Sequence, residues 1–212
     1  VTLDDANRGI TLLAIGGTAS TTTDPGGFTN GTPVEARRYE GGCTFRPESN
    51  SVTLTVNCPI TGPGTLIKNG LGRLVLGGAN TYTGQTLVVA GTIEPASASA
   101  FGTGPLRIKG QGRLLRRHPD VVLPNGVALG STVAFEADSA VIIEWDPEYT
   151  VSGNVTVPLF SVPTDLAPDP AAIPVSHGLQ NYRATVVAED AGGGRTQFSV
   201  QLAFQGTLMM VQ

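Results

Sequence analysis

The sequence is poor in charge, in aromatic side chains and in cysteine. Charged residues make up 14% of the 212 residues and aromatic residues 6%, with two cysteines, two histidines and one tryptophan. The formal net charge is −4, and Lys and Arg are not clustered as phosphate binding requires, so nucleic acid is not expected as a partner. The best basic run, Arg113 to His118, has no aromatic platform beside it and is interpreted as a solvated strand edge.

Long apolar runs and helical periodicity are also missing. No apolar stretch reaches the roughly 18 residues of a spanning helix, so we expect no membrane insertion by this chain. Glycine interrupts every stretch long enough for an amphipathic helix, which argues against a helical bundle. The hydrophobic fraction is an ordinary 40%, and glycine (28) and proline (15) are abundant. This composition predicts an all-β chain of short strands and tight turns.

Strand-like runs recur through most of the chain, each closed by Gly, Pro or Asn. Apolar residues alternate in them with Thr, Lys, Arg or Gly. Leu74 and Leu76 therefore face one way and Arg73 the other, and Leu87 and Val89 repeat the two-residue spacing. We expect strands at residues 51–56, 65–68, 73–76, 86–90, 106–109, 113–116, 131–136, 140–145 and 151–157.

The spacing of strands and turns favours a solenoid over a β-sandwich. Glycine-rich turns and Leu-bearing strands follow one another closely from Gly62 onward, as in a parallel β-helix whose coils each contribute two or three strands. Corners of such a coil need residues that tolerate positive φ. We expect Asn80, Asn125 and Asn154 at corners or in ladders, with simple turn formation as an equal alternative.

The composition changes near Val157. Residues 1–157 are predicted to form the parallel β-helix, with an irregular N-terminal part to about residue 42. Residues 158–174 contain five prolines, which interrupt ladder hydrogen bonds and predict a linker. Residues 175–212, with strand-like runs at 182–189 and 197–203, are predicted to form a small β-rich C-terminal cap.

The two cysteines lie close together in the sequence. Cys43 and Cys58 have no CxxC spacing, and His118 and His177 are far from both, so no zinc site is expected. A disulfide between Cys43 and Cys58 is favoured, and two free thiols are the alternative. A disulfide would imply an oxidising, extracytoplasmic location.

A repeat pattern occupies residues 62–93. Its most specific element is one continuous run, Gly78, Ala79, Asn80, Thr81, Tyr82, Thr83 and Gly84. The segment resembles the autotransporter-associated β-strand repeat, found in passenger regions of bacterial surface proteins. Two residues depart from that pattern: Arg73 stands where Thr is more usual, and Gln85 where a second Gly is common. The resemblance implies a right-handed parallel β-helix on the outside of a Gram-negative or related bacterium, with no catalytic residue. We also expect no cofactor and no metal.

The sharpest enzymatic signal is the run from Glu144 through Asp146 to Glu148. On a strand, these three carboxylates would share one face, an arrangement that looks like the catalytic strand of jelly-roll glucanases. Glu144 would then be the nucleophile, Asp146 a helper and Glu148 the acid. Pro147, the single tryptophan and the repeat pattern argue against this interpretation.

An acidic outward face is the simpler explanation of these carboxylates. Together with Glu136 and Asp138 they could bind Ca²⁺ through oxygen ligands, although no calcium-roll repeat is present. We therefore predict a non-enzymatic, extracellular or cell-surface structural or adhesive β-helix that can associate with itself. Its expected partners are other copies, neighbouring β-helix segments and surface glycans. The alternative is a carbohydrate-binding or polysaccharide-degrading β-protein that uses Glu144, Asp146 and Glu148.

Overall fold

The computed structural model describes residues 2–3, 10–12, 38–39 and 42–205, and its strands form three sheets. Within these residues, helical structure is limited to two short turns, η1 (Thr164–Leu166) and η2 (Pro170–Ala172). The predicted all-β fold is confirmed. Most of the irregular N-terminal part that we predicted up to residue 42 lies outside the described residues.

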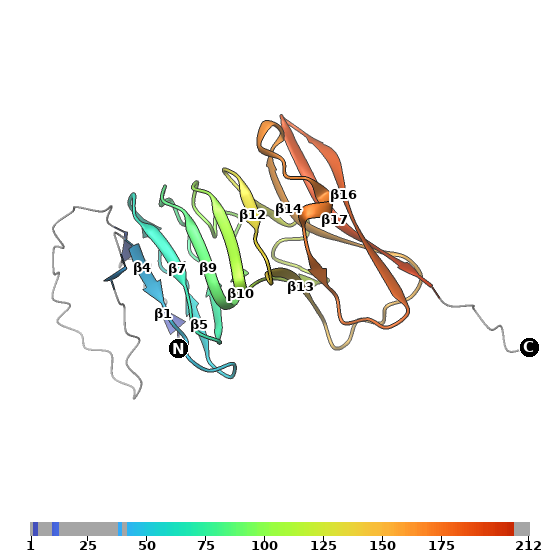
Figure 1. The fold of residues 1–212 in the computed structure, drawn as a ribbon, viewed down its shortest axis with the longest axis horizontal. Helices are drawn as coiled ribbons and strands as arrows, with labels where there is room; N and C mark the ends of the chain where they lie inside the picture. Colours follow the sequence, from blue (N-terminus) through green and yellow to red (C-terminus); the bar gives the residue numbers. More distant parts are fainter. Residues whose placement is uncertain (1, 4–9, 13–37, 40–41, 206–212) are drawn as a thin grey trace, which may run out of the picture.

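Two columns of parallel strands form two sides of a solenoid (Figure 1). The first column contains β4 (Gly42–Phe45), β7 (Thr65–Lys68), the first parts of β9 (Thr86–Pro95) and β10 (Leu106–His118), and β12 (Val133–Phe135). The second contains β1 (Thr2–Leu3), β5 (Thr53–Val56), β8 (Arg73–Leu76), the later parts of β9 and β10, β13 (Ala140–Trp145) and β15 (Val175–Ser176). Because β9 and β10 take part in both columns, these strands belong to one sheet, which also includes β3 (Arg38–Tyr39).

A third side closes the coil. Strand β2 (Ile10–Thr11) pairs in parallel with β6 (Ile60–Thr61) on this side. One coil further along, the backbone N–H of Thr81 donates to the carbonyl oxygen of Ile60 at 2.9 Å. Each coil thus turns three times before it returns to the first column, which confirms the predicted parallel β-helix.

The strand registers set the length of the coil. Leu66 lies beside Thr86, and Thr86 lies beside Leu106, so each of these coils takes 20 residues. Leu106 lies beside Val133, so the next coil takes 27 residues. This spacing decides which residues, distant in the sequence, become neighbours on the surface.

The interior of the β-helix is a ladder of aliphatic side chains. Leu54, Leu74, Ile93, Leu114 and Val141 are successive neighbours in the second column. Each exposes 2% or less of its surface. Complete burial of such a side chain contributes about 1.5–3 kcal/mol, so this column is a main source of cohesion between coils.

Strand β9 departs from the predicted alternation. Thr86 and Val88 are fully buried, whereas Leu87 and Val89 are half-buried on the outer side. The parallel register places Thr86 directly in the interior column, where its hydroxyl is hydrogen-bonded to the hydroxyl of Tyr82. A buried phenol needs a polar partner, which explains a threonine at an inward position.

Glycines stack at one corner of the coil. A Cβ atom on Gly84 would lie 2.1 Å from the carbonyl oxygen of Gly64. A Cβ atom on Gly104 would lie equally close, at 2.1 Å, to the carbonyl oxygen of Gly84. No side chain fits at that distance, so close stacking of the coils accounts for part of the high glycine content.

A four-stranded sheet lies at the far end of the β-helix from β4 and β7 (Figure 1). Its strand order is β11 (Val127–Ala128), β14 (Val155–Pro163), β17 (Arg195–Phe204) and β16 (Tyr182–Gly192). Strands β14, β17 and β16 are antiparallel, while β11 joins β14 in parallel and connects this sheet to the solenoid. The rings of Phe160 and Phe198 stack at 5.2 Å within this sheet.

The predicted boundary at Val157 lies inside β14. We had predicted a linker from residue 158 onward, but residues 158–163 belong to this strand. The ladder of β14 with β17 shifts its register between Pro158 and Phe160, and a proline is tolerated at such an irregularity because it has no N–H to donate. Residues 164–174 then form η1, η2 and irregular backbone. The division into domains otherwise stays a prediction.

Candidate functional site

Asn80, in the middle of the predicted repeat run, connects three coils. Its side chain is 2% exposed. The Oδ1 atom accepts a hydrogen bond from the N–H of Ile60 at 2.9 Å, and Nδ2 donates to the carbonyl oxygen of Ala100 at 2.7 Å. The ladder role expected for Asn80 is therefore present, and its physical basis is the satisfaction of buried backbone groups at a corner.

Tyr82, in the same run, points into the coil. Its side chain is fully buried, and burial raises the pKa of its hydroxyl. The residue therefore cannot stack on a glycan at the surface. It fills the interior next to Thr86.

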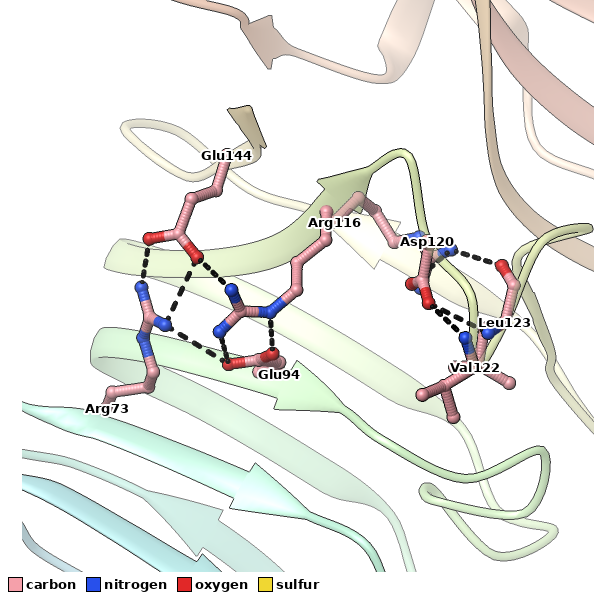
Figure 2. A network of polar contacts seen from close by, with 8 residues as sticks. Arg73, Glu94, Arg116, Asp120, Val122, Leu123 and Glu144 are labelled. Carbon is pink, nitrogen blue, oxygen red and sulfur yellow. Dashed lines mark hydrogen bonds and ion pairs between the residues drawn. The ribbon is translucent and has the colours of Figure 1, made fainter. Parts of the chain in front are cut away.

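A network of two arginines and two glutamates crosses the outer face of the second column (Figure 2). Arg73 lies on β8, Glu94 on β9, Arg117 on β10 and Glu144 on β13. Arg73 Nη2 is 2.6 Å from Glu144 Oε1, and Arg73 Nη1 is 3.3 Å from Glu94 Oε2. Arg117 Nε is 2.5 Å from Glu94 Oε1, and Arg117 Nη1 is 3.0 Å from Glu144 Oε2. Each charge has two partners of opposite sign, so the network ties four successive strands together.

The electrostatics of the network favour the charged forms of Glu144 and Arg117. The hydrogen bond from Arg73 lowers the pKa of Glu144, and the charge of Arg117 adds to this effect. The hydrogen bond to Glu94 raises the pKa of Arg117. A general acid needs a raised pKa, so the environment of Glu144 is suited to an ion pair and unsuited to proton donation.

The three carboxylates of the glucanase-like run do not share a strand face. Strand β13 ends at Trp145, and Asp146 and Glu148 lie in the turn that follows. Asp146 Oδ1 accepts a hydrogen bond from the N–H of Glu148 at 2.8 Å. The geometry expected from the sequence is therefore absent, because Pro147 follows directly after Asp146 and the chain turns there.

Aromatic side chains gather where β13 ends. The rings of Trp145 and Tyr149 stack at 6.1 Å, and His118 lies edge-on to both of them. Burial lowers the pKa of His118. A cavity of about 350 Å³ lies beside this cluster, and its lining includes Arg117, Glu144 and Trp145. An indole beside paired charges can hold a small polar ligand, in particular a sugar ring.

The acidic residues considered for Ca²⁺ are kept apart. Glu136 pairs with Arg107, Glu144 pairs with two arginines, and Asp138 lies in a turn with φ of 64°. Within the described ranges, no three His, Cys, Asp or Glu side chains are grouped as metal ligands. The calcium hypothesis has no support from this geometry.

The two cysteines are not joined in the structure. Cys43 lies in β4 of the first column, whereas Cys58 follows β5 of the second column. Burial raises the pKa of the Cys43 thiol, which favours its protonated, unreactive form. The disulfide predicted from the sequence is not present in this structure. Its formation in an oxidising location stays a prediction.

Arg116 was predicted to be solvated and is instead buried, with 1% of its surface exposed. Its Nη2 atom is 3.2 Å from Asp120 Oδ2 and donates to the carbonyl oxygen of Leu123 at 2.9 Å. Its Nε atom donates to the carbonyl oxygen of Pro158 on β14 at 3.4 Å. Burial lowers the pKa of Arg116, and the charge of Asp120 opposes this change. The hydrogen bond to Pro158 therefore connects β10 to the C-terminal sheet, and the ion pair with Asp120 offsets the cost of burying the guanidinium.

Lys68 is the second buried cation, and no part of it is exposed. Its Nζ atom donates to the carbonyl oxygens of Asn69 at 3.0 Å, Gly70 at 2.7 Å and Ala90 at 2.9 Å. Ala90 belongs to the next coil, so Lys68 clamps two successive corners of the solenoid. Its role is structural, since three backbone acceptors occupy the ammonium group.

Replacing Lys68 by Met should change how stability depends on pH. Burial lowers the pKa of Lys68 to about 8, whereas a lysine in an unfolded chain titrates near about 10.4. Between these values the unfolded state binds more protons, so the free energy of unfolding of the wild type rises with pH. Lys68→Met lacks this contribution. The stability difference in favour of the wild type, measured by urea unfolding, should therefore grow above about pH 8.

The control for this experiment is Lys109→Met, on the neighbouring strand β10, where the lysine is not fully buried. The free energy of unfolding of each variant is subtracted from that of the wild type at each pH, which cancels the titration of all other groups. A wild-type advantage over Lys68→Met that stays constant across this pH range would show that the buried ammonium does not titrate there.

Comparison with known proteins identifies the repeat. The family model described as passenger-associated-transport-repeat matches residues 66–94, a range that includes the run from Gly78 to Gly84. The chain therefore contains an autotransporter-associated repeat, as its resemblance predicted. It is also similar to the adhesin BmaC autotransporter of Brucella suis biovar 1 (strain 1330), with 36% identity over 94 residues.

The similarity covers a limited part of each chain. It extends over 43% of this repeat protein but 3% of the length of the adhesin. No solved structure matches the chain. In the described part of this repeat protein, no helix is long and apolar enough to cross a bilayer. The repeat family is that of exported, surface-directed passenger regions, which agrees with the location expected from the sequence.

Proposed function

We propose that this chain is a non-enzymatic, exported element of a bacterial surface, with a structural and adhesive role, and that its copies associate. The observation that carries the proposal is the repeat over residues 66–94, which lies within a continuous stack of parallel strands. The similarity to an autotransporter named as an adhesin supports the adhesive part.

The structural role follows from how the coils are held together. The buried aliphatic ladder, the side chain of Asn80 and the clamp at Lys68 each join neighbouring coils. Such a stack is stiff along its axis, because every coil contacts both neighbours. It can therefore hold a contact surface away from the cell.

The absence of enzymatic activity is part of the proposal. Glycoside hydrolysis needs two facing carboxyl groups, one of them able to donate a proton. Glu144 is held as a carboxylate by Arg73 and Arg117, and Asp146 and Glu148 follow it in a turn. This arrangement favours binding over catalysis.

Beads coated with the purified chain test the adhesive role. They should bind to a layer of cultured epithelial cells at least about tenfold more than beads coated with serum albumin, because many weak contacts act together on a bead. Beads coated with heat-unfolded chain control for non-specific adsorption. Binding of the folded chain at the albumin level would contradict the adhesive role.

The same assay can test the cavity beside β13. Beads that carry Trp145→Ala should bind less if a cell-surface glycan occupies this cavity. Leu71→Ala is the matched control, because Leu71 is 52% exposed and lies in the turn between β7 and β8. Equal binding by both variants would locate adhesion elsewhere on the chain.

A further inference from the structure

Strand β16 is a long edge strand. It runs from Tyr182 to Gly192 and is the last strand in the order of its sheet. Among the described strands, it pairs with β17 on one side and with none on the other. The turn η2 contacts β16, but the N–H groups of Ala172 and Ile173 bond within that turn. Among the described residues, no backbone hydrogen bond joins η2 to β16, so the outer N–H and C=O groups of β16 can pair with another strand.

The side chains of β16 are those of a strand that can accept a neighbour. Tyr182, Ala184 and Val186 are half-buried on the inner face, and Arg183 and Glu189 are exposed on the outer face. Natural edges are usually protected by proline, by lysine or by a bulge. Between residues 182 and 189 there is no proline or lysine, and the ladder with β17 is regular until Asp190.

The sequence of β16 is complementary to itself in one antiparallel register. When two copies of the strand are centred on Val186, Arg183 of each copy lies opposite Glu189 of the other. Ala184 lies opposite Ala188 in the same register. Opposite charges on directly facing residues stabilise a strand pair, whereas a parallel, in-register pair would place like charges together. A shift of the centre by one residue in either direction separates the two charges.

We propose that two copies of this chain pair through β16, antiparallel about Val186, to form a continuous sheet across both molecules. This inference rests on the proposed role at the bacterial surface, in which copies associate. It identifies the edge of β16 as the part of the chain through which they do so. The pairing is two-fold symmetric, so it closes as a dimer. The buried area of a single strand pair is small, so we expect weak, reversible association that becomes effective where many copies are held on one surface.

Charge reversal at the two exposed positions tests this pairing. Sedimentation velocity of the wild type should show a dimer that grows with concentration between about 10 µM and about 1 mM. Arg183→Glu and Glu189→Arg should each weaken the dimer about tenfold, because both facing pairs become repulsive. Both positions are exposed, so the fold is expected to persist, and circular dichroism checks this.

Mixing the two single variants gives the decisive result. Each variant carries like charges at both positions, but one is acidic and the other basic, so an equimolar mixture should form a heterodimer. The double variant Arg183→Glu/Glu189→Arg should recover the wild-type dimer. Arg46→Glu, on an exposed residue remote in sequence from β16, controls for the change in net charge.

Three outcomes would overturn the proposal. These are a wild type that stays monomeric up to about 1 mM, single variants that dimerise like the wild type, and a mixture that remains monomeric. The experiment uses purified chain without cells, so its failure is distinct from a failure of adhesion. Conversely, beads that do not bind cells would leave a measured dimer unaffected.

Discussion

Replacing Gly91 by alanine is expected to lower the free energy of unfolding by about 3–5 kcal/mol. Gly91 has a φ of +67°, and a Cβ atom there would lie 2.3 Å from the carbonyl oxygen of Gly70 and 2.6 Å from that of Gly72. It would also lie 2.7 Å from Nζ of Lys68, the atom that clamps the same corner. The substitution therefore adds backbone strain, pushes two coils apart and disturbs a buried cation.

Gly153→Ala separates the backbone strain from the contacts between coils. Gly153 also has a φ of +67°, but a Cβ atom there would meet nothing within 4 Å. We expect a loss of about 1–2 kcal/mol for this variant. The measurement is urea unfolding followed by the fluorescence of the single tryptophan. Equal losses for both variants would mean that the corner at Gly91 relaxes and that the coils are not tightly stacked there.

The strands of the solenoid could be predicted from the sequence because each buries one face. The alternation of apolar and polar residues predicted the bounds of β7, β8 and β13 correctly, at 65–68, 73–76 and 140–145. The end of the β-helix was predicted less well. The prolines near residue 158 indicated a break, but Pro158 and Pro163 are accommodated within β14. Proline content alone does not exclude a strand that carries an irregularity.

The buried cations were missed for a physical reason. Charge was taken to indicate solvent exposure, as it usually does. The alternation itself carried the contrary signal, because Lys68 is two residues from the buried Leu66, and Arg116 is two residues from the buried Leu114. Residues two apart on a strand share a face, so both cations point inward. Backbone carbonyls and Asp120 then satisfy them.

The network on the outer face could not be predicted from local patterns. Arg73 and Glu144 are 71 residues apart and meet at 2.6 Å. Their contact depends on the number of residues in each intervening coil, and the coil before β12 takes 27 residues where each of the two coils before it takes 20. The sequence shows that position 144 carries a carboxyl group, but the strand register decides which charged side chains surround it.

Arg116→Met should destabilise the protein by about 3–5 kcal/mol, because breaking a buried ion pair leaves an uncompensated charge. Asp120 is 11% exposed and would lose the guanidinium of Arg116, and the carbonyl oxygen of Leu123 would lose its donor. Methionine keeps much of the aliphatic stem, so the loss reports mainly on the charge and the hydrogen bonds. Urea unfolding followed by tryptophan fluorescence measures it.

The adjacent arginine provides a matched comparison on the opposite face of the same strand. Arg117 is 50% exposed, and its 8% exposed partner Glu94 keeps its contact with Arg73, so Arg117→Met should cost only about 0–1 kcal/mol. Adding Asp120→Asn to Arg116→Met should recover part of the loss, because the unpaired charge is removed. The amide oxygen can still accept the hydrogen bonds that Asp120 Oδ1 receives from the N–H groups of Val122 and Leu123. If the double variant were no more stable than Arg116→Met, the cost would lie in the backbone carbonyls of Leu123 and Pro158 that lose their donor, and not in the ion pair.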